Sequence, residues 1–167
     1  MDDHPEPLAS LYLETSVVSY ATARLSRDPL IRGHQELTRR WWDESRHSYH
    51  LFTSPATMSE VSQGDPREAR RRLELLAEAD TLEAVPQVQA LALELGTCLH
   101  IPEKKAADAA HLAFAVHYHM AYLLTWNCTH LANATVFRAL ADVCRERSLW
   151  LPIICTPEGM IRSGKEV

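Results

Sequence analysis

LYLETSVVSY, residues 11–20, joins an apolar run of strand-forming side chains to a segment that can begin a helix. The carboxylate of Glu14 and the hydroxyls of Thr15 and Ser16 stand at the junction. A strand that leads directly into a helix is typical of a parallel sheet, whose strands are connected by helices. Because an acid beside a buried strand is costly without a partner, Glu14 is the first candidate for a functional side chain.

The same alternation of short apolar runs and longer helical patterns continues along the chain. Strands are expected at residues 11–14, 49–54, 81–85, 121–125 and 151–156. Helices are expected at residues 16–24, 29–48, 54–64, 66–79, 87–98, 102–120 and 134–148. This order predicts an α/β fold, a three-layer α/β/α sandwich with a central parallel sheet.

Length and composition suit one compact domain, because the chain has 167 residues and a hydrophobic content of 46%. We expect a single domain over residues 1–167, with a core at about residues 10–158 and short terminal tails. The start, MDDHPEP, is acidic and lacks the basic and apolar regions of a secretory signal. No later segment approaches the ~20 apolar residues that cross a bilayer. A cytoplasmic protein without a membrane contact is therefore expected.

Net charge and the residues that commonly bind metals narrow the functions further. A net charge of −5 argues against a protein that binds nucleic acid with its whole surface, although it allows a basic rim around a local site. The four cysteines are well separated and form no CxxC pair, so we expect them to be reduced, ordinary residues. The nine histidines show no recognised zinc spacing, and we expect structural or surface roles for them.

Four polar residues lie close enough to the expected strands to meet at one edge of the sheet. Glu14 ends the first strand, and Asn127 follows the strand at 121–125. Glu60 and Asp108 are expected in early turns of helices that follow strands or loops at the same edge. In a parallel sheet the strands end, and the next helices begin, at one edge, so convergence of the four is predicted. Each residue alone has an ordinary explanation, since acids near helix starts favour the helix dipole and Asn127 suits a turn.

Crowded carboxylates require a cation. At one site, Glu14, Glu60 and Asp108 would repel one another and shift their pKa values unless a positive ion shared the site. Oxygen ligands suit Mg²⁺ or Mn²⁺, with the other metal positions left to water or phosphate oxygens. Such an ion lowers the pKa of a water nucleophile, and the set therefore predicts metal-assisted hydrolysis of a phosphodiester.

Several stretches together carry a family resemblance. They are LYLETSVVSY (11–20), TMSEV (57–61), KKAADAAHLAFAV (104–116), YLLTWNCTHLAN (122–133) and the terminal IICTPEGM (153–160). In this order they resemble the PIN-domain family, in particular the VapC-like toxins of bacterial type II toxin-antitoxin pairs. The resemblance implies an α/β/α sandwich, a homodimer, and a Mg²⁺- or Mn²⁺-dependent ribonuclease that acts on RNA. It also implies a cognate antitoxin whose tail occupies a groove near the site.

Under this resemblance Glu14, Glu60 and Asp108 are the acidic positions that bind the metal, and Asn127 completes the catalytic set. Glu14 departs from the usual Asp by one methylene, which displaces its oxygens by ~1.5 Å. Asn127 stands where many relatives carry a fourth acid, so it offers a carbonyl ligand or orients a water but brings no negative charge.

Two hydroxyl residues support this set. Ser16 and Thr125 match positions that help to orient the metal, its water or neighbouring carboxylates in the family. Helix capping by Ser16 and strand-end hydrogen bonding by Thr125 explain the two residues equally well.

Basic side chains near the motifs are candidate contacts for RNA phosphates. In the run REARRR (67–72), however, the interleaved Glu68 and the following Glu74 favour solvated, ion-paired helix faces. The adjacent Trp41 and Trp42 favour packing over base stacking, because neighbouring helix positions point in different directions. The candidate phosphate contacts are Arg24, Arg27, Lys104, Lys105, Arg67, Arg70, Arg71 and Arg72.

The leading functional interpretation is a VapC-like endoribonuclease. The main alternative, motivated by Glu14 and Asn127, is a PIN-fold binding protein that keeps antitoxin or RNA contacts but has weak or no nuclease activity. A third interpretation is a PIN nuclease that acts on DNA or on structured RNA outside toxin-antitoxin control. Metal-dependent cleavage by the purified chain would separate the first interpretation from the second.

Overall fold

The structure is a computed structural model that describes residues 7–161. Within that range one sheet contains five strands: β1 (Ala9–Leu13), β2 (Tyr49–Thr53), β3 (Asp80–Thr81), β4 (Tyr122–Leu124) and β5 (Ile153–Cys155). The helices of the same range are α1 (Thr15–Thr22), α2 (Pro29–Glu44), α3 (Pro55–Val61), α4 (Pro66–Leu76), α5 (Pro86–Cys98), α6 (Ala106–His117), α7 (Ala134–Glu146) and α8 (Pro157–Met160). The single domain and tails expected over residues 1–167 extend into residues 1–6 and 162–167, which lie outside the described residues.

The sheet has the strand order β3-β2-β1-β4-β5, and every neighbouring pair is parallel. β1 lies at the centre, where Leu11 pairs with Leu51 on one side and with Tyr122 on the other. Side chains alternate between the faces of a strand, so Tyr12 packs on one side of the sheet while Leu11 and Leu13 pack on the other. Because all strands run in one direction, their carboxyl ends share one edge.

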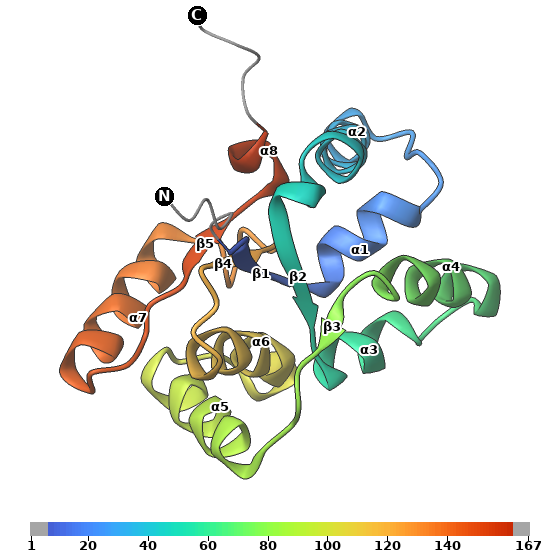
Figure 1. Ribbon diagram of the computed structural model, residues 1–167. Coiled ribbons are helices and arrows are strands. Elements are labelled where there is room, and N and C mark those ends of the chain that lie inside the picture. Colours follow the sequence, from blue (N-terminus) through green and yellow to red (C-terminus); the bar gives the residue numbers. More distant parts are fainter. Residues whose placement is uncertain (1–6, 162–167) are drawn as a thin grey trace, which may run out of the picture.

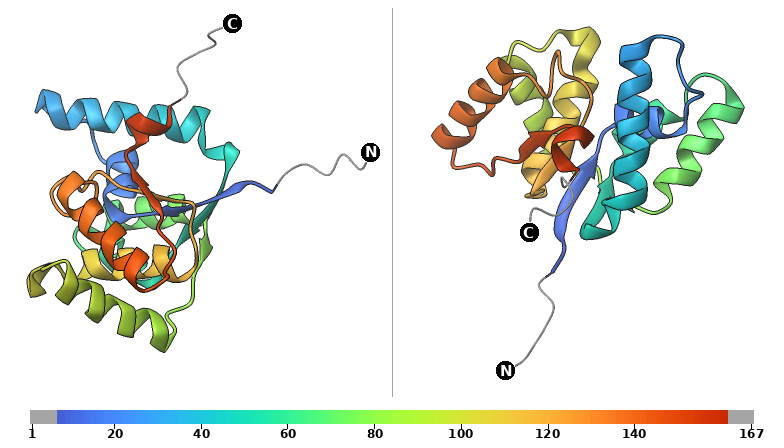
Figure 2. Two further views of the ribbon diagram at one scale, coloured as in Figure 1. Left: turned by 90° about the vertical axis from the view of Figure 1, so that its left-hand side faces the viewer. Right: turned by 90° about the horizontal axis from the view of Figure 1, so that it is seen from above.

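Helices cover both faces of this sheet (Figure 1). α5, α6 and α7 pack on the face that carries Tyr12, whereas α1, α2 and α4 pack on the face that carries Leu11 and Leu13. The view from above in Figure 2 shows the two groups of helices on either side of the strands. α3 contacts helices of both groups, α4 and α6. The predicted α/β/α sandwich with a central parallel sheet is therefore confirmed.

Two long helices are shorter than the sequence predicts. The helix expected over residues 29–48 is α2, which ends at Glu44 and is followed by a 3₁₀ turn at Arg46–Ser48. The helix expected over residues 102–120 is α6, which begins only after a 3₁₀ turn at Glu103–Lys105. Tighter 3₁₀ turns are common at helix ends, where backbone groups lack partners within the α-helix.

α3 is also shorter than predicted, which changes the place of Glu60. The helix was expected to continue to Gly64, but it has seven residues and ends at Val61. The backbone N–H and the hydroxyl of Ser62 both donate to the carbonyl of Met58, and Gly64 adopts a positive φ of 87° that turns the chain away. Glu60 therefore lies near the end of its helix and not in an early turn.

The strand expected over residues 81–85 is the two-residue β3. Leu82 still donates its backbone N–H to β2, but the N–H of Val85 turns back to the carbonyl of Glu83 and the chain enters α5. Near the carboxyl end of the described residues, the last strand is followed by the short helix α8, capped by Thr156.

Other expectations concern the core and the membrane. Trp41 and Trp42 are 0% and 8% exposed and contact each other edge-on, so the packing interpretation of this pair is confirmed. All four cysteines are free thiols. None of the helices in residues 7–161 combines the length and the apolar character that crossing a membrane requires.

Candidate functional site

A pocket of about 370 Å³ lies at the carboxyl edge of the sheet. The four residues of the predicted catalytic set, Glu14, Glu60, Asp108 and Asn127, all line it. The structure therefore brings the set together, while its catalytic role stays a prediction. The remaining lining residues are Thr15, Ser16, Lys105, Thr129 and His130.

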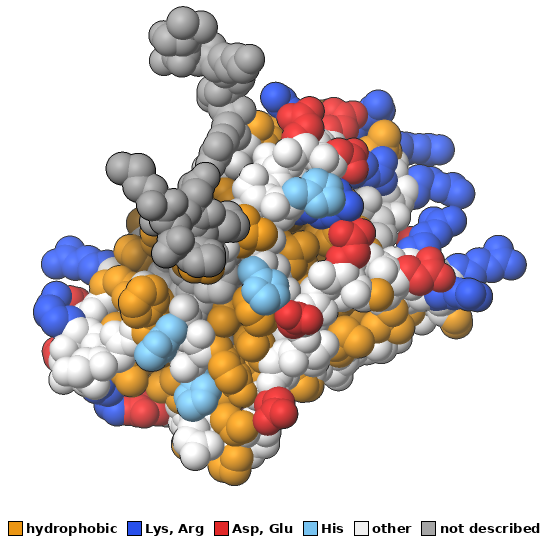
Figure 3. Space-filling model, in the orientation of Figure 1, with side chains coloured by type: hydrophobic (Ala, Val, Ile, Leu, Met, Phe, Trp, Pro, Cys, Tyr) orange, Lys and Arg blue, Asp and Glu red, His pale blue; other side chains and the backbone are white. Residues whose placement is uncertain are grey.

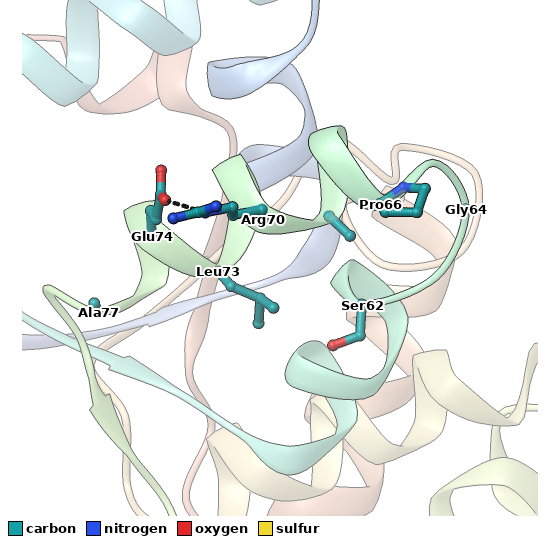
Figure 4. Close-up of a pocket in the computed structure, with 8 residues that line it drawn as sticks. Ser62, Gly64, Pro66, Arg70, Leu73, Glu74 and Ala77 are labelled. Atoms are coloured by element: carbon teal, nitrogen blue, oxygen red, sulfur yellow. Dashed lines mark hydrogen bonds and ion pairs between the residues drawn. The ribbon is translucent and has the colours of Figure 1, made fainter.

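Two of the larger hollows elsewhere on the described residues offer less chemistry. The hollow between α3 and α4 measures about 590 Å³, and its Arg70 and Glu74 pair with each other at 2.9 Å beside the apolar Leu73 (Figure 4). A groove of about 560 Å³ between α5 and α6 is lined mainly by small and apolar residues such as Leu93 and Ile101. Because their charges are paired or few, neither hollow matches the acidic pocket as a site for a cation or a reaction.

Glu14 occupies the turn between β1 and α1 and is 5% exposed. Its Oε2 caps α1 by accepting the backbone N–H of Ser16 at 3.0 Å, and it also accepts the Ser16 hydroxyl. The hydroxyl of Thr125 donates to the same oxygen at 2.7 Å. The backbone N–H of Glu14 donates to the carbonyl of Leu124 in β4. One carboxylate oxygen is thus fixed by three donors from two adjacent strand ends.

The two supporting hydroxyls join Glu14 to the segment after β4. Besides donating to Glu14, the Ser16 hydroxyl accepts the backbone N–H of Trp126 at 2.8 Å. The Thr125 hydroxyl accepts the backbone N–H of Asn127 at 2.9 Å. The residue that caps α1 is Glu14, so the capping explanation of Ser16 is wrong. Thr125 combines a strand-end hydrogen bond with support of the carboxylate.

Glu60 reaches the pocket from the end of α3, with a side chain that is 34% exposed. Its Oε2 accepts hydrogen bonds from the Thr15 hydroxyl and from Nε2 of His111, the latter at 2.9 Å. The His111 hydrogen bond lowers the pKa of Glu60 against the opposing effect of burial, and Thr15 and Lys105 lower it further. Glu60 is therefore a carboxylate at neutral pH.

Asp108 lies in the first turn of α6 and is 7% exposed. Its Oδ1 accepts a hydrogen bond from Nδ2 of Asn127 at 3.0 Å. The amide of Asn127 is oriented in turn by the backbone N–H of His130, which donates to its Oδ1 at 3.1 Å. Burial raises the pKa of Asp108, and the nearby His130 and the Asn127 hydrogen bond partly offset that rise.

The three carboxylates share one arrangement. Each presents one oxygen to protein donors and leaves the other without a hydrogen-bond partner among residues 7–161. The free oxygens are Oε1 of Glu14, Oε1 of Glu60 and the buried Oδ2 of Asp108. A buried oxygen without a donor costs free energy, which a bound cation removes. Hard divalent cations take carboxylate oxygens and fill their remaining positions with water, so these residues fit Mg²⁺ or Mn²⁺.

His111, which the sequence did not single out, lies behind the carboxylates. It belongs to α6, three residues after Asp108, and is 0% exposed. Its Nδ1 lies 2.8 Å from the hydroxyl of Tyr12, while Nε2 donates to Glu60. The signal that could have revealed it is the Asp-x-x-His spacing, which places two polar side chains on one face of an alanine-rich helix.

Glu14, Glu60 and His111 offer ligand atoms that lie within 4.8 Å of one another and could hold a metal ion. Both ring nitrogens of His111, however, are already hydrogen-bonded. Burial alone would lower its pKa, but Tyr12, Glu60 and Glu14 raise the pKa of His111 to about 10. A protonated imidazole donates from both nitrogens and has no lone pair for a metal. Asp108, whose Oδ2 lacks a hydrogen-bond partner, is chemically the better third ligand, although it does not belong to the group of atoms within 4.8 Å that Glu14 and Glu60 form with His111.

The rim of the pocket carries a small amount of positive charge. Lys105 is exposed and lines the pocket beside the half-buried His130. Of the other basic residues considered from the sequence, Lys104, Arg24 and Arg27 are also exposed. Lys105 is therefore the candidate phosphate contact that lies nearest to the acidic set.

The arginine run of α4 serves its own helix. Arg70 pairs with Glu74 and Arg71 with Glu68, and Arg72 donates to backbone carbonyls of the preceding turn. In Figure 3, Lys and Arg side chains lie along the side that carries α4, and a second group lies at the opposite edge of this face. The interpretation of this run as a solvated, ion-paired helix face is confirmed.

A scan of the sequence against protein-family models and a search of curated proteins found no match. Solved structures with a similar fold do exist. The chain is similar to the structure of VapBC-1 from nontypeable Haemophilus influenzae, with a TM-score of 0.54 and 13% identity, over 88% of this chain and 97% of that chain. It is also similar to the structure of VapBC2 from Rickettsia felis bound to a DNA fragment from their promoter, with a TM-score of 0.50, 15% identity, and 87% and 97% coverage. Likeness at these identities concerns the fold alone, and it agrees with the α/β/α sandwich with a central parallel sheet expected from the sequence.

Proposed function

We propose that this protein is a Mg²⁺- or Mn²⁺-dependent endoribonuclease, a VapC-like toxin that a cognate antitoxin neutralises. The observation that carries the proposal is the shared arrangement of Glu14, Glu60 and Asp108, which all line the pocket, each with one oxygen held by protein donors and the other without a hydrogen-bond partner among the described residues. This arrangement leaves carboxylate oxygens available to a hard cation, and those of Glu14 and Glu60 already lie close enough to share one. It lies on a fold similar to those of two VapBC structures, which supports a nuclease of this type.

Under this proposal each residue of the pocket has a role that its contacts indicate. Glu14, Glu60 and Asp108 hold the ion through their free oxygens, and Asn127 fixes the orientation of Asp108. When bound, the ion lowers the pKa of a water nucleophile and stabilises the charge that develops on the phosphodiester. Lys105 at the rim attracts the RNA backbone, because phosphate contacts depend on positive charge.

The two departures from the usual acidic set favour a single ion. The longer side chain of Glu14 is compensated by three donors that fix its Oε2, so its extra reach does not loosen the ligand. Asn127 is used as a donor to Asp108 and adds no negative charge to balance a second cation. One divalent ion therefore suits the charge of the pocket better than two.

The partners belong to the same proposal. The similar structures carry the name VapBC, and this supports an antitoxin as partner of the present chain. A homodimer and an RNA substrate, which the family resemblance implies, and the cytoplasmic location expected from the sequence stay predictions.

A second candidate is a PIN-fold protein that binds the antitoxin or RNA without effective cleavage. The specific observation behind it is that the position after β4 carries Asn127, whose amide is already engaged with Asp108 and His130. Such a site could bind an ion and still lack the charge that drives hydrolysis.

The deciding experiment incubates purified, antitoxin-free protein with mixed cellular RNA in Mg²⁺ or Mn²⁺ and measures fragments over time. Chelation and Glu60→Gln should remove cleavage, whereas the matched control Glu74→Gln on α4, whose carboxylate pairs with exposed Arg70, should retain it. Cleavage that survives chelation would rule out the metal mechanism. Metal binding without cleavage would favour the binding protein, and cleavage of single- or double-stranded DNA instead would replace the substrate.

A further inference from the structure

A chain of buried polar groups runs from the core to the acidic pocket. The Tyr12 hydroxyl lies 2.6 Å from the Ser54 hydroxyl and 2.8 Å from Nδ1 of His111. Nε2 of His111 then reaches Oε2 of Glu60 at 2.9 Å. Tyr12, Ser54 and His111 are all 0% exposed, so water does not compete for these hydrogen bonds.

The geometry assigns the direction of the last hydrogen bond in either charge state of the ring. If His111 is neutral, Tyr12 donates to Nδ1 and the single ring proton sits on Nε2, facing Glu60. If His111 is charged, Nδ1 donates to Tyr12 and Nε2 still donates to Glu60. Thr57, whose hydroxyl donates to the carbonyl of Leu13, and Ser54 can accept from Tyr12 in that case. A donor to Glu60 is therefore present in both states.

Glu60 needs this donor more than the other two acids do. Its side chain is 34% exposed, whereas Glu14 and Asp108 are 5% and 7% exposed as residues. It also comes from the end of a seven-residue helix, where few backbone hydrogen bonds limit its motion. Two donors from separate helices, Thr15 of α1 and His111 of α6, converge on its Oε2 and leave Oε1 free.

We propose that His111 is a positioning residue, held in place by the Tyr12 hydroxyl, that fixes Oε2 of Glu60 so that Oε1 is presented to the metal. His111 itself is not a metal ligand, although its Nε2 lies near enough to the acids to act as one. This inference rests on the proposed function, because it takes the ion of that function as the group that Glu60 serves. Partners of metal-binding carboxylates commonly set metal affinity in this indirect way.

The first test is an NMR measurement on ¹⁵N-labelled protein, which does not depend on activity. The His111 Nε2–H proton should give a slowly exchanging downfield signal that is absent from His111→Gln and shifts in Glu60→Gln. Saturating Mg²⁺ should leave this proton in place. Loss of the proton when Mg²⁺ binds would identify His111 as a ligand and overturn the proposal.

The second test measures Mn²⁺ affinity by calorimetry for paired variants. Tyr12→Phe removes one oxygen and keeps the ring that stacks on Phe114, and it should weaken Mn²⁺ binding about tenfold. His111→Leu should weaken binding by about 10–100-fold, and His111→Gln, which keeps a donor, should recover part of that loss. The matched controls, His117→Gln and Tyr118→Phe at the carboxyl end of α6, should bind Mn²⁺ as the wild type does.

The outcomes separate this inference from the function on which it rests. If the wild type binds Mn²⁺ but cleaves no RNA, the proposed nuclease fails while the affinities of the variants still decide the role of His111. If Tyr12→Phe and His111→Gln bind Mn²⁺ as tightly as the wild type, the positioning role is wrong and the nuclease stands. Wild-type protein without Mn²⁺ binding would overturn both. Should His111→Leu fail to fold, Tyr12→Phe and His111→Gln carry the test.

Discussion

Glu14 and Glu60 present free oxygens to the same pocket, but the molecule holds them by different means. The position of Glu14 is set by the pairing of β1 with β4. Leu13 pairs with Leu124, and the residues that directly follow them, Glu14 and Thr125, are hydrogen-bonded to each other. The position of the Glu60 side chain is set instead by helices that pack on the sheet. Its donors come from α1 and α6, which lie on opposite faces of the sheet.

The difference shows two ways to fix an acid at a sheet edge. Backbone hydrogen bonds between paired strands fix the position of a side chain at the strand end. The same pairing brings the Thr125 donor to Glu14. A side chain on a short helix has no such frame and depends on buried partners that must themselves be fixed, as Tyr12 fixes His111. Substitutions that disturb core packing should therefore displace the Glu60 side chain more than that of Glu14.

The largest expected effect comes from removing either charge. Glu14→Gln and Glu60→Gln should each lower kcat/KM for RNA cleavage by about a thousandfold, because loss of metal stabilisation costs several kcal/mol and each 1.36 kcal/mol is tenfold. Steady-state cleavage of a labelled RNA measures this. If Glu14→Gln kept activity within tenfold of the wild type, only Glu60 and Asp108 would hold the ion. Glu14 and Glu60 would then not be equivalent ligands.

Metal binding should appear next as a gain in stability. Mg²⁺ at a hundredfold excess over its Kd should raise the free energy of unfolding by about 2.7 kcal/mol, since only the folded chain assembles the three acids. Urea unfolding with and without Mg²⁺, at ionic strength matched with NaCl, measures the difference. The gain should vanish in both glutamate variants; a gain that persists in them points to an ion bound elsewhere.

The comparison is sharpened by removing one donor from each glutamate. Thr15→Val leaves Glu60 with His111 alone, whereas Thr125→Val leaves Glu14 with both donors of Ser16. Each change should lower the affinity for the metal by about 10–100-fold, and Thr15→Val should lower it more than Thr125→Val. Calorimetry on these isosteric variants gives the ranking, and Thr97→Val on the exposed face of α5 serves as the control. The reverse ranking would contradict the view that Glu60 is the more weakly held acid.

The smallest effect concerns the metal-free protein. The buried Oδ2 of Asp108 has no donor among the described residues, and burial raises the pKa of this carboxyl group. Asp108→Asn removes the buried charge and should therefore stabilise the fold by about 1 kcal/mol. Urea unfolding in a chelator measures the gain, and cleavage by the same variant should be lost. A destabilised, inactive variant would mean that Asp108 is a structural residue.

The fold could be predicted from the sequence because its signals are local. The apolar run before Glu14, and Ser54 followed by Pro55 at the start of α3, each set a boundary by interactions within a few residues. Boundaries that depend on tertiary contacts were less accurate. β3 was predicted too long, because its length depends on where α5 must begin, and α3 was predicted to reach Gly64.

The candidate site could be predicted only in part, and for the same reason. Glu14 and Asn127 follow strands, so topology brings them together without knowledge of side chains. His111 lacked such a signal, because its partners are 99 and 51 positions away along the chain, at Tyr12 and Glu60. A histidine in an alanine-rich helix looks like a core residue until the groups that face it are known.

The central position of β1 has a consequence for the synthesis of this protein. The ribosome makes β1 well before β4, the strand that completes one side of it at residues 122–124. Until that strand has left the ribosome, Glu14 lacks Thr125 and the pocket lacks Asn127. Domains fold as units during translation, and here the unit closes only after β4 has been made. Under the proposed function, the pocket that would act on RNA is therefore incomplete while the segments before β4 are being made.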